Sequence, residues 1–570
     1  MSQPTGNSEQ PPVDLELFKD PAAHRACSTA QRIHLSIQKC QKIAGIYALS
    51  LADIELLSTK FWDFHRHPVV CADGGATTLL SIQFNLVIGT ILDCVGHRPD
   101  LDHLFEDLLA YRISGQFCLT EVDHGLDAAN LETTAEEHED GSGFVLNTPH
   151  DGAAKFMPPT VPCGIPCVAV VMARLVRGGA DLGVRPFLVE LNDGEHMSPG
   201  VVAKLLPNRG GSSPVAHCLT SFTNVRLPPT SLLSPGGPGS SEPIPFRTTI
   251  RRVAIGSLAL SGAAIPSLAH AATIAAKYSQ RRLTRTGGVE FPIIAFPTQH
   301  APILIALAQS FVLAEFYKRA AEVFSEQTTD PRVQHGIATS FKAVAARHAL
   351  DGMLELSERC GAQGLFNYNK ISEFHADLRG NAIAEGDILG LSIRLISELL
   401  QDKYTLDAFL SPSEHNTPLA RHAESLLILA RTTLQKRCNG SHRSPEFARL
   451  VLPRCRPITE ALGMHYAYAA AVGAGMDARI TRLYLTTAMR ADEGWYVEHF
   501  GAAADALFEA QAKAVTDALP VLGQWIGRGG AEGYVSAPIV KEEEWRMFAG
   551  SLDVFREGPS NGEQIVRSRL

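Results

Sequence analysis

The spacing of apolar residues divides the chain into four regions. Residues 15–112 repeat apolar positions every three or four residues, as in 30–42 and 79–94, which predicts helices. Between about 115 and 233 the pattern changes to short β-branched or alternating runs cut by Gly, Pro, Asn and Asp, which is typical of strands. From about 248 to 403, and again to about 555, the helical period returns, including 417–436, 457–476 and 479–490.

The clearest strand runs begin at Phe144, Cys167, Arg185 and Ala216, and a Pro/Gly/Ser-rich segment at 228–245 closes this region. A chain of 570 residues is too long for one core. We expect an α+β fold that is mainly α, with a β-barrel or sandwich domain between helical domains. The expected boundaries are an N-terminal helical domain at 1–114, the β-domain at 115–245, a helical bundle at 246–402 and a C-terminal helical domain at 403–570.

Composition narrows the class of protein. A hydrophobic content of 45%, a charged content of 19% and a net charge of −9 describe a globular protein without a basic field for nucleic acid. Eleven scattered cysteines and a polar N-terminus without a signal-peptide pattern predict a reduced intracellular compartment. Cys163 and Cys167 form the one close pair, and without a second pair at matching spacing we expect buried thiols and no metal.

Residues 253–276 contain no Asp, Glu, Lys or Arg, a length sufficient to span a membrane. Ala, Gly and Ser dominate this stretch, and Pro266 and His270 lie within it. Small residues allow close helix packing, so we expect a helix buried among other helices and no transmembrane span.

Two segments far apart in the chain carry candidate chemistry. The first is Thr120-Glu121-Val122-Asp123-His124-Gly125, and the second is Cys360-Gly361-Ala362-Gln363-Gly364 followed by Ala384-Glu385-Gly386-Asp387. Together they resemble the flavin-contacting and catalytic segments of the acyl-CoA oxidases and dehydrogenases. The interval of 25 positions from Cys360 to Glu385, and a second helical domain at the C-terminus, look like the oxidase branch. The resemblance implies FAD, an acyl-CoA substrate, O₂ and a homodimer.

Glu385 is the candidate catalytic base. The α-proton of an acyl thioester is too weakly acidic to leave at neutral pH unless a carboxylate is aimed at it. Residues 388–401 have helical period, so Glu385 sits at or just before a helix N-terminus, where the dipole favours negative charge. The resemblance implies that Glu385 takes the α-proton while the β-hydrogen leaves as hydride to the flavin, giving a trans-2-enoyl thioester and, with O₂, hydrogen peroxide. The alternative is a solvated carboxylate in the first turn of a helix.

The resemblance also implies contacts for other residues. Thr120 would hydrogen-bond the flavin, Arg282 would pair with the FAD pyrophosphate, and the glycines would let the backbone approach the cofactor. The alternatives are that Thr120 is an ordinary turn residue, that Arg282 is a charge on a helix surface, and that the glycines form a helix C-cap and turn. The implied cofactor-binding set is Thr120, Gly125, Pro159, Arg282, Gln299, Gly361, Gly364 and Asp387, and Gly386 is the implied substrate contact.

The chain departs from the oxidase pattern at cofactor positions. Asp123 replaces a glycine, Pro159 and Thr160 replace two glycines, and Pro297 stands where the family has Gln. Gln299 lies two positions further on, where a helix turns the side chain by about 200°. An alternative is therefore a repurposed scaffold that binds a thioester without flavin chemistry, uses Glu385 for isomerisation or dehydration, or serves as an inactive subunit of a hetero-oligomer.

The chain ends in Ser568-Arg569-Leu570, a conservative variant of the Ser-Lys-Leu peroxisomal address. The preceding Gly/Pro/Ser/Asn-rich segment is typical of a flexible spacer that would expose this tail. We expect recognition by the peroxisomal import receptor and a peroxisomal location.

Overall fold

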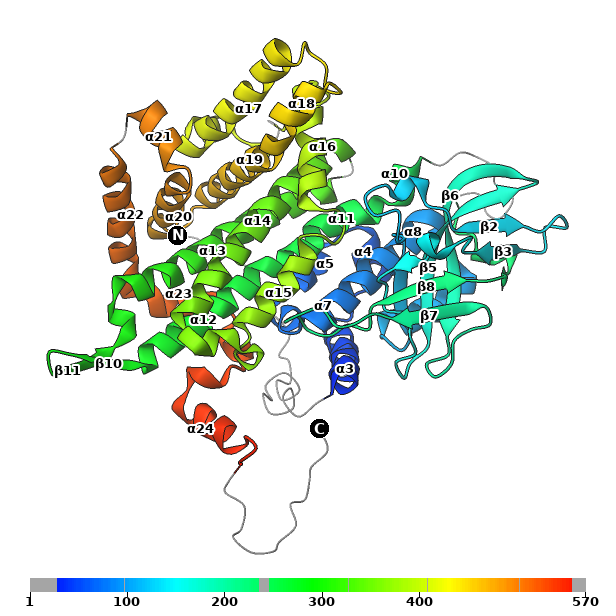
Figure 1. The fold of residues 1–570 in the computed structure, drawn as a ribbon, viewed down its shortest axis with the longest axis horizontal. Helices are drawn as coiled ribbons and strands as arrows, with labels where there is room; N and C mark the ends of the chain where they lie inside the picture. Colours follow the sequence, from blue (N-terminus) through cyan, green and yellow to red (C-terminus); the bar gives the residue numbers. More distant parts are fainter. Residues whose placement is uncertain are drawn as a thin grey trace, which may run out of the picture.

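The computed structural model describes residues 28–96, 98–234, 245–326, 328–406, 409–501 and 503–555. The N-terminal segment before residue 28, most of the Pro/Gly/Ser-rich segment and the tail that ends in Ser568-Arg569-Leu570 lie outside the described residues. Within them the architecture is α+β and mainly α, and Figure 1 shows a β-domain on one side of a large helical assembly.

The N-terminal helices pack between the β-domain and the main bundle. They are α3 (Thr29–Tyr47), α4 (Leu51–Glu55), α5 (Thr59–His65), α6 (Pro68–Cys71), α7 (Gly74–Ser81), η1 (Ile82–Ile88), α8 (Gly89–Val95) and α9 (Asp102–Leu109). The helix expected at 79–94 is present, but its centre, η1, is a π-helix. The wider turn lets the Gln83 amide donate to the carbonyl oxygens of Leu108 and Ile113, which ties this helix to the start of the β-domain.

The β-domain contains two sheets. The strands are β1 (Ser114–Cys118), β2 (Thr134–Glu137), β3 (Phe144–Asn147), β4 (Lys155–Phe156), β5 (Cys167–Arg177), β6 (Ala180–Asn192), β7 (Val201–Leu205), β8 (Cys218–Phe222) and β9 (Val225–Leu227). One sheet has the order β1-β5-β2-β3-β9 with β6 on the other edge of β5, and the second has the order β4-β8-β7. Side chains from both sheets, such as Phe144, Phe187 and Phe222, share one buried core. The strand run that begins at Ala216 is split into β8 and β9 by a turn at Asn224, where φ is +50°.

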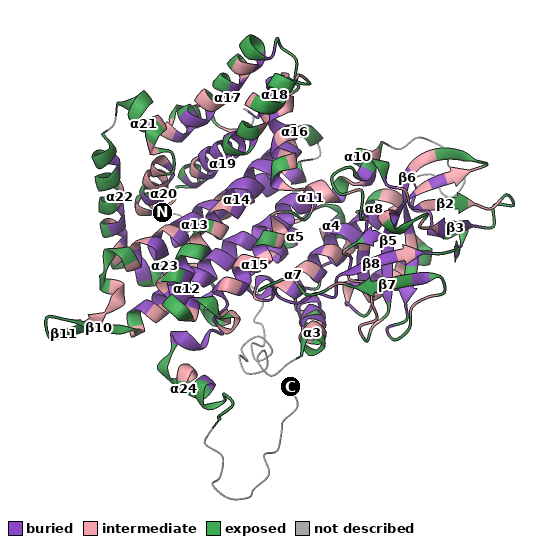
Figure 2. Cartoon of the chain, in the orientation of Figure 1, coloured by how far each residue is buried: buried purple, intermediate pink, exposed green. Residues whose placement is uncertain are grey.

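The central bundle is built on four long helical segments. They are α11 (Arg251–Ala259), α12 (Ala264–Arg281), α13 (Pro297–Ser325) and α14 (Pro331–Arg359), preceded by α10 (Phe246–Thr249) and followed by α15 (Ile371–Asn381) and α16 (Ile388–Leu400). Figure 2 shows that α13 and α14 are buried along most of their length. Three helical stretches, Gly74–Val95, Arg251–Arg281 and Pro297–Ser325, are long and apolar enough to cross a membrane, and 72%, 89% and 78% of their apolar windows are buried inside the protein.

One element contradicts the expectation of continuous helices from 248 to 403. A hairpin of β10 (Leu283–Thr286) and β11 (Val289–Pro292) separates α12 from α13. Gly287 and Gly288 have φ of +60° and +83°, and two consecutive residues with positive φ are what a tight hairpin turn requires. The Gly-Gly pair between two short alternating runs is the sequence signal for this hairpin. Because of the hairpin, Arg282 is the C-cap of α12 rather than a residue inside a helix.

Further helices cover the far side of the bundle. They are α17 (Pro418–Arg437), α18 (Pro445–Leu450), α19 (Leu452–Gly473), α20 (Ala478–Arg490), α21 (Glu493–Phe500), α22 (Ala504–Ala518), α23 (Leu522–Arg528) and α24 (Glu542–Gly550). The helices predicted at 417–436, 457–476 and 479–490 correspond to α17, α19 and α20. The last of the set, α24, crosses back to the ends of α12 and α14, as Figure 1 shows.

Candidate functional site

Glu385 lies in the short loop between α15 and α16, two residues before the cap of α16. The cap is Asp387, whose carboxylate accepts hydrogen bonds from the backbone N–H groups of Leu389 (3.0 Å) and Gly390 (3.1 Å). Glu385 has φ +58° and Gly386 has φ +105°, so the chain makes a left-handed turn at the catalytic candidate. A residue with a side chain adopts this conformation only when its surroundings impose it. The predicted position of Glu385 just before a helix N-terminus is confirmed.

The Glu385 carboxyl group is enclosed by helices of the bundle. Its Oε2 is buried and has no hydrogen-bond partner among the described residues. The carboxyl group rests on Gly256 of α11, and a Cβ atom at Gly256 would lie 1.5 Å from Oε2. The neighbouring Ser257 donates its hydroxyl to the Glu385 carbonyl oxygen at 2.6 Å. The backbone of Glu385 is therefore fixed, while its carboxylate keeps a free oxygen.

Burial determines the acid–base behaviour of this carboxyl group. Desolvation raises the pKa of Glu385 to about 8, and the nearby Lys342 ammonium opposes this rise. An ordinary glutamate is a weak base, and one whose pKa approaches neutrality is better matched to proton abstraction near pH 7–8. Glu385 is thus a candidate for proton transfer near neutral pH.

Substituting Gly256 with alanine tests whether this position of the carboxyl group is required for activity. The new Cβ occupies the place of Oε2, so we expect Glu385 to swing away and kcat to fall by about 10²-fold, since a misplacement of about 1 Å has that cost. Gly45→Ala in α3, where a Cβ has nothing within 4 Å, is the matched control and is expected to retain activity. Steady-state turnover of both variants is the measurement, and equal activities would contradict the required placement.

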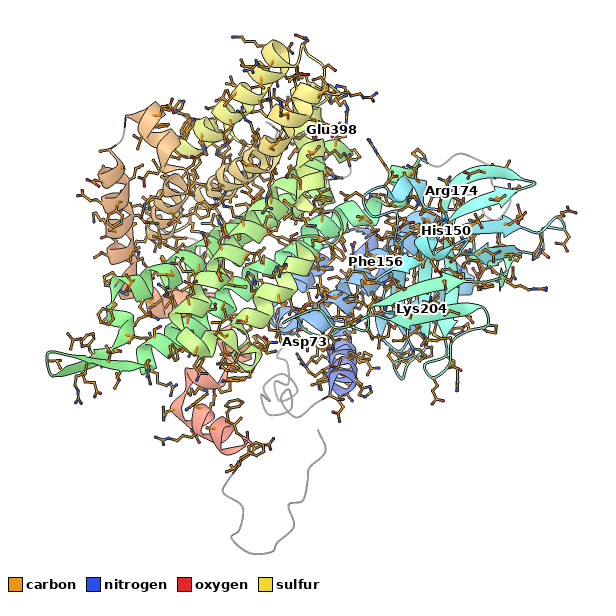
Figure 3. The ribbon with its side chains drawn as sticks, viewed as in Figure 1. Asp73, His150, Phe156, Arg174, Lys204 and Glu398 are labelled. Carbon is orange, nitrogen blue, oxygen red and sulfur yellow. The ribbon has the colours of Figure 1, made fainter. Side chains whose placement is uncertain are left out.

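Exposed apolar side chains lie on both sides of the contact between Leu126 of the β-domain and Gly390 of α16. Ile383 and Leu389 flank the Glu385 loop in sequence and are 65% and 46% exposed. The β-domain adds Val122, Leu126 and Phe156, and a Cβ at Gly390 of α16 would lie 3.2 Å from Leu126. Figure 3 labels Phe156 at the border between the β-domain and the helices. We call Val122, Leu126, Phe156, Ile383 and Leu389 the apolar border.

The first sequence motif forms a β-domain loop that contributes Val122 to this border. The Thr120 carbonyl oxygen accepts from the Phe156 N–H at 2.8 Å, and Gly125 is exposed next to Leu126. Glu121, by contrast, points into the domain, where it makes a 2.9 Å ion pair with Lys155, and both side chains are fully buried. Glu121 also accepts from the backbone N–H groups of Glu132 and Thr133. The motif glutamate therefore stabilises the loop, and this leaves Thr120 and Gly125 at its surface.

The departures from the oxidase pattern have visible structural roles. Thr160 is fully buried, and its hydroxyl is hydrogen-bonded to that of Thr220 at 2.6 Å. The Thr160 carbonyl oxygen accepts from the Asn192 amide at 2.8 Å. The threonine side chain thus points into the β-domain core, away from the border, and Pro159 beside it is half-buried and has no N–H to offer.

The remaining cofactor candidates gather at the other end of the bundle. Gln299, in the first turn of α13, donates to Ser279 Oγ (2.8 Å) and to the Arg359 carbonyl oxygen (2.7 Å), so its amide nitrogen ties three helices together. Gly364 lies so near the end of α14 that a Cβ would be 2.0 Å from the Ser357 carbonyl oxygen. Gly361 has φ +58° and open space around it.

A cavity of about 380 Å³ lies beside Gly361 and Arg282. Its lining residues are Tyr278, Arg281, Arg282, Cys360, Gly361, Ala362, Gln363, Ile539, Glu542 and Trp545. Arg281 is held by an ion pair with Glu542, whereas the exposed Arg282 guanidinium makes no hydrogen bond or ion pair in the part of the chain that the structure describes. The wall contributed by Ile539, Glu542 and Trp545 was not predicted, because it comes from a segment more than 170 positions beyond Cys360.

The two groups of candidates are far apart within one chain. Lys342, beside Glu385, and Arg359, beside Gln299, are both on α14 and are seventeen residues apart, which is roughly 25 Å along a helix. Figure 1 agrees, with the β-domain and the β10–β11 hairpin at opposite ends of the molecule. One chain therefore presents the Glu385 loop at one end and a separate cavity at the other.

The fold is that of the acyl-CoA oxidases. The acyl-CoA oxidase 1 structure from Yarrowia lipolytica superposes with a TM-score of 0.81 over 98% of this chain and 93% of that one, at 17% sequence identity. A Caenorhabditis elegans acyl-CoA oxidase-1 structure, solved with FAD and ATP, gives a TM-score of 0.78 over 94% of this chain and 89% of that one, at 16% identity.

Sequence similarity to acyl-CoA oxidases covers part of the chain. Residues 255–400 match the acyl-CoA oxidase C-alpha1 domain. Human peroxisomal acyl-coenzyme A oxidase 3 is 28% identical over 390 residues, 62% of this chain and 55% of that protein. Arabidopsis thaliana acyl-coenzyme A oxidase 2, peroxisomal, is 25% identical over 353 residues, 56% of this chain and 50% of that protein. The chain thus spans about half the length of these relatives in the matched region, and within that region it is similar to acyl-CoA oxidases at 25–28% identity.

Proposed function

We propose that this protein is an FAD-dependent acyl-CoA oxidase, an oxidoreductase that introduces a trans-2 double bond into an acyl-CoA thioester. The observation that carries the proposal is the half-buried Glu385 side chain, whose Oε2 is buried without a hydrogen-bond partner among the described residues and whose pKa is raised to about 8. The names of the relatives support the same reaction.

The chain's own residues have distinct roles in this reaction. The apolar border removes the acyl chain from water, since contiguous exposed apolar side chains mark binding surfaces. The Glu385 carboxylate takes the α-proton. Gly386, at φ +105°, places no side chain beside the thioester, and the N-terminus of α16 favours the negative charge that develops on it.

The residues fit FAD if two copies of the chain share it. The cavity offers the free Arg282 guanidinium and the open backbone of Gly361 to a pyrophosphate, while Thr120 and Gly125 lie at the catalytic end. Because these two ends are roughly 25 Å apart on one chain, we infer a homodimer in which the cavity of one subunit faces the β-domain of the other. Bound FAD would accept the β-hydrogen as hydride and pass the electrons to O₂, giving hydrogen peroxide.

The first test is the absorbance spectrum of the purified protein, followed by addition of acyl-CoA in air with peroxide monitored. We expect a yellow protein that bleaches and then produces peroxide. A colourless protein that binds acyl-CoA without producing peroxide would overturn the proposal and favour the scaffold without flavin chemistry.

Arg282→Ala tests the cofactor end separately. Loss of a charged hydrogen-bond donor to a phosphate is expected to weaken FAD binding by about 10–100-fold. Arg285→Ala is the control, because Arg285 lies three residues further on, in the hairpin, and faces Glu290 at 3.9 Å. Titration of the apoprotein with FAD measures both, and equal affinities for the two variants would remove Arg282 from the cofactor site.

We also propose a peroxisomal location, with Ser568, Arg569 and Leu570 recognised by the import receptor. The relatives named peroxisomal support this location. A fluorescent fusion that ends in Ser568-Arg569-Leu570 is expected to colocalise with a peroxisomal marker, and the same fusion without these three residues is expected to spread through the cytosol. Identical distributions would contradict the tail as the address.

A further inference from the structure

Lys342 is a buried lysine on α14 that the sequence motifs do not include. Its side chain is 1% exposed, and its ammonium group donates to the carbonyl oxygens of Ala384 (2.5 Å) and Gly386 (2.6 Å). These two residues are the neighbours of Glu385 on either side. A single ammonium group therefore holds both ends of the catalytic residue.

We infer that Lys342 is the positioning residue of the catalytic base: it holds the Glu385 loop in its left-handed turn, and its charge maintains the carboxylate form of Glu385. The inference rests on the proposed role of Glu385 as the base.

The backbone of the Glu385 loop needs support from its surroundings. Glu385 has φ +58°, which is unfavourable for a residue with a side chain, so the conformation needs contacts that impose it. Those contacts are the two Lys342 hydrogen bonds and the hydroxyl of Ser257 on the Glu385 carbonyl oxygen. Three consecutive carbonyl groups are thus held from two helices, α11 and α14, so the loop cannot rotate without breaking them.

The charge of the Lys342 ammonium group also acts on Glu385. A buried ammonium is unfavourable unless opposite charge and acceptors compensate it, and the carboxylates that act on Lys342 are those of Glu385 and Asp387. Burial lowers the pKa of Lys342 to about 8, while these two carboxylates raise it. In return the ammonium lowers the pKa of Glu385 against the effect of burial.

Other charged groups around the loop are engaged elsewhere. On α11, Arg251 and Arg252 are both paired with Asp93, at 2.9 and 2.7 Å. On the β-domain side, His124 faces Glu132 at 3.8 Å. On α16, Arg394 is paired with Glu398 of the same helix, at 3.3 Å. Lys342 is the cation that acts on the Glu385 carboxyl group.

The test is the pH dependence of kcat/KM in Lys342→Met and Lys342→Arg. The wild-type rate is expected to fall as the pH drops through the pKa of Glu385, because the base becomes protonated. Without the ammonium this pKa rises, so in Lys342→Met the acidic limb moves to higher pH by roughly one unit or more. Lys342→Arg keeps the charge and is expected to keep the limb near its wild-type position.

A buried lysine outside the site provides the control. Lys39 of α3 is 2% exposed and paired with Asp73 at 2.7 Å. Lys39→Met is expected to lower stability without moving the acidic limb. An unmoved limb in Lys342→Met, a shift to lower pH, or an equal shift in Lys39→Met would each overturn the inference. If Lys342→Met does not fold, Lys342→Gln, which keeps amide donors without charge, is expected to give the same rise.

An infrared titration separates this inference from the proposed function. The band of the protonated Glu385 carboxyl group, assigned by its loss in Glu385→Gln, reports the midpoint without turnover. A higher midpoint in Lys342→Met supports the inference even if the wild-type protein forms no peroxide, and an unchanged midpoint rejects it even if the protein is an oxidase.

Discussion

Glu385→Gln is expected to lower kcat by about 10²–10⁴-fold, the range that a positioned general base contributes. Glutamine has nearly the same shape, so the contacts of the loop backbone with Lys342 and Ser257 remain, and only the ability to accept the α-proton is lost. The variant should therefore keep its fold and the flavin that we propose, while turnover falls. Steady-state peroxide production and the flavin spectrum, measured on the same sample, check both statements.

Glu355→Gln is the matched control for this experiment. Glu355 lies on α14 with an exposed side chain, so the same chemical change is made there without the loop or the apolar border. It is expected to turn over at the wild-type rate. If Glu385→Gln retained most of its activity, another group would have to be the base.

Lys155→Met is expected to produce the largest loss of stability, about 3–5 kcal/mol, because it leaves the fully buried Glu121 carboxylate without its cation. Lys155 also donates to the Met172 carbonyl oxygen at 2.7 Å, which loses its partner as well. Burial of an uncompensated charge is the cause. Thermal or chemical unfolding of the β-domain measures the effect.

The control for Lys155→Met is an exposed ion pair, Lys513 with Asp517 at 2.9 Å in α22. Lys513→Met is expected to change stability by only about 0.3–0.5 kcal/mol, the usual value for such a pair on a helix surface. Similar unfolding midpoints for the two variants would mean that the buried pair does not stabilise the motif loop.

The parts of the fold that the sequence predicted well are those with a regular period. The strand at Phe144–Asn147 and the helix that begins at Ile388 have the expected starts, because alternation and a three-to-four spacing are local properties of the chain. The position of Glu385 just before a helix followed from the second of these. The hairpin Leu283–Pro292 was missed because its strands are four residues each and mostly exposed, so they lack the alternation of burial that marks a longer strand.

The parts of the site that the sequence did not predict depend on contacts between distant residues. Lys342 precedes Ala384 by 42 positions, and Gly256 precedes Glu385 by more than 120, so neither is marked by any local pattern. Thr160 stands where the oxidase pattern has a glycine, and its side chain is held in the β-domain core by Thr220. Such pairings are fixed by the packing of helices and sheets rather than by propensity.

Ile539, Glu542 and Trp545 form one wall of the cavity and are among the last described residues to be synthesised. The cavity is therefore completed late in synthesis of the chain. The ribosome makes α12 and α14 long before α24, and domains generally fold from the N-terminal side as they emerge. A nascent chain therefore displays Arg282 and Gly361 on an open surface until its last described helix arrives. Nucleotide capture at this cavity would consequently be a late event in biogenesis, and a truncated translation product would reach the cell without a closed cofactor compartment.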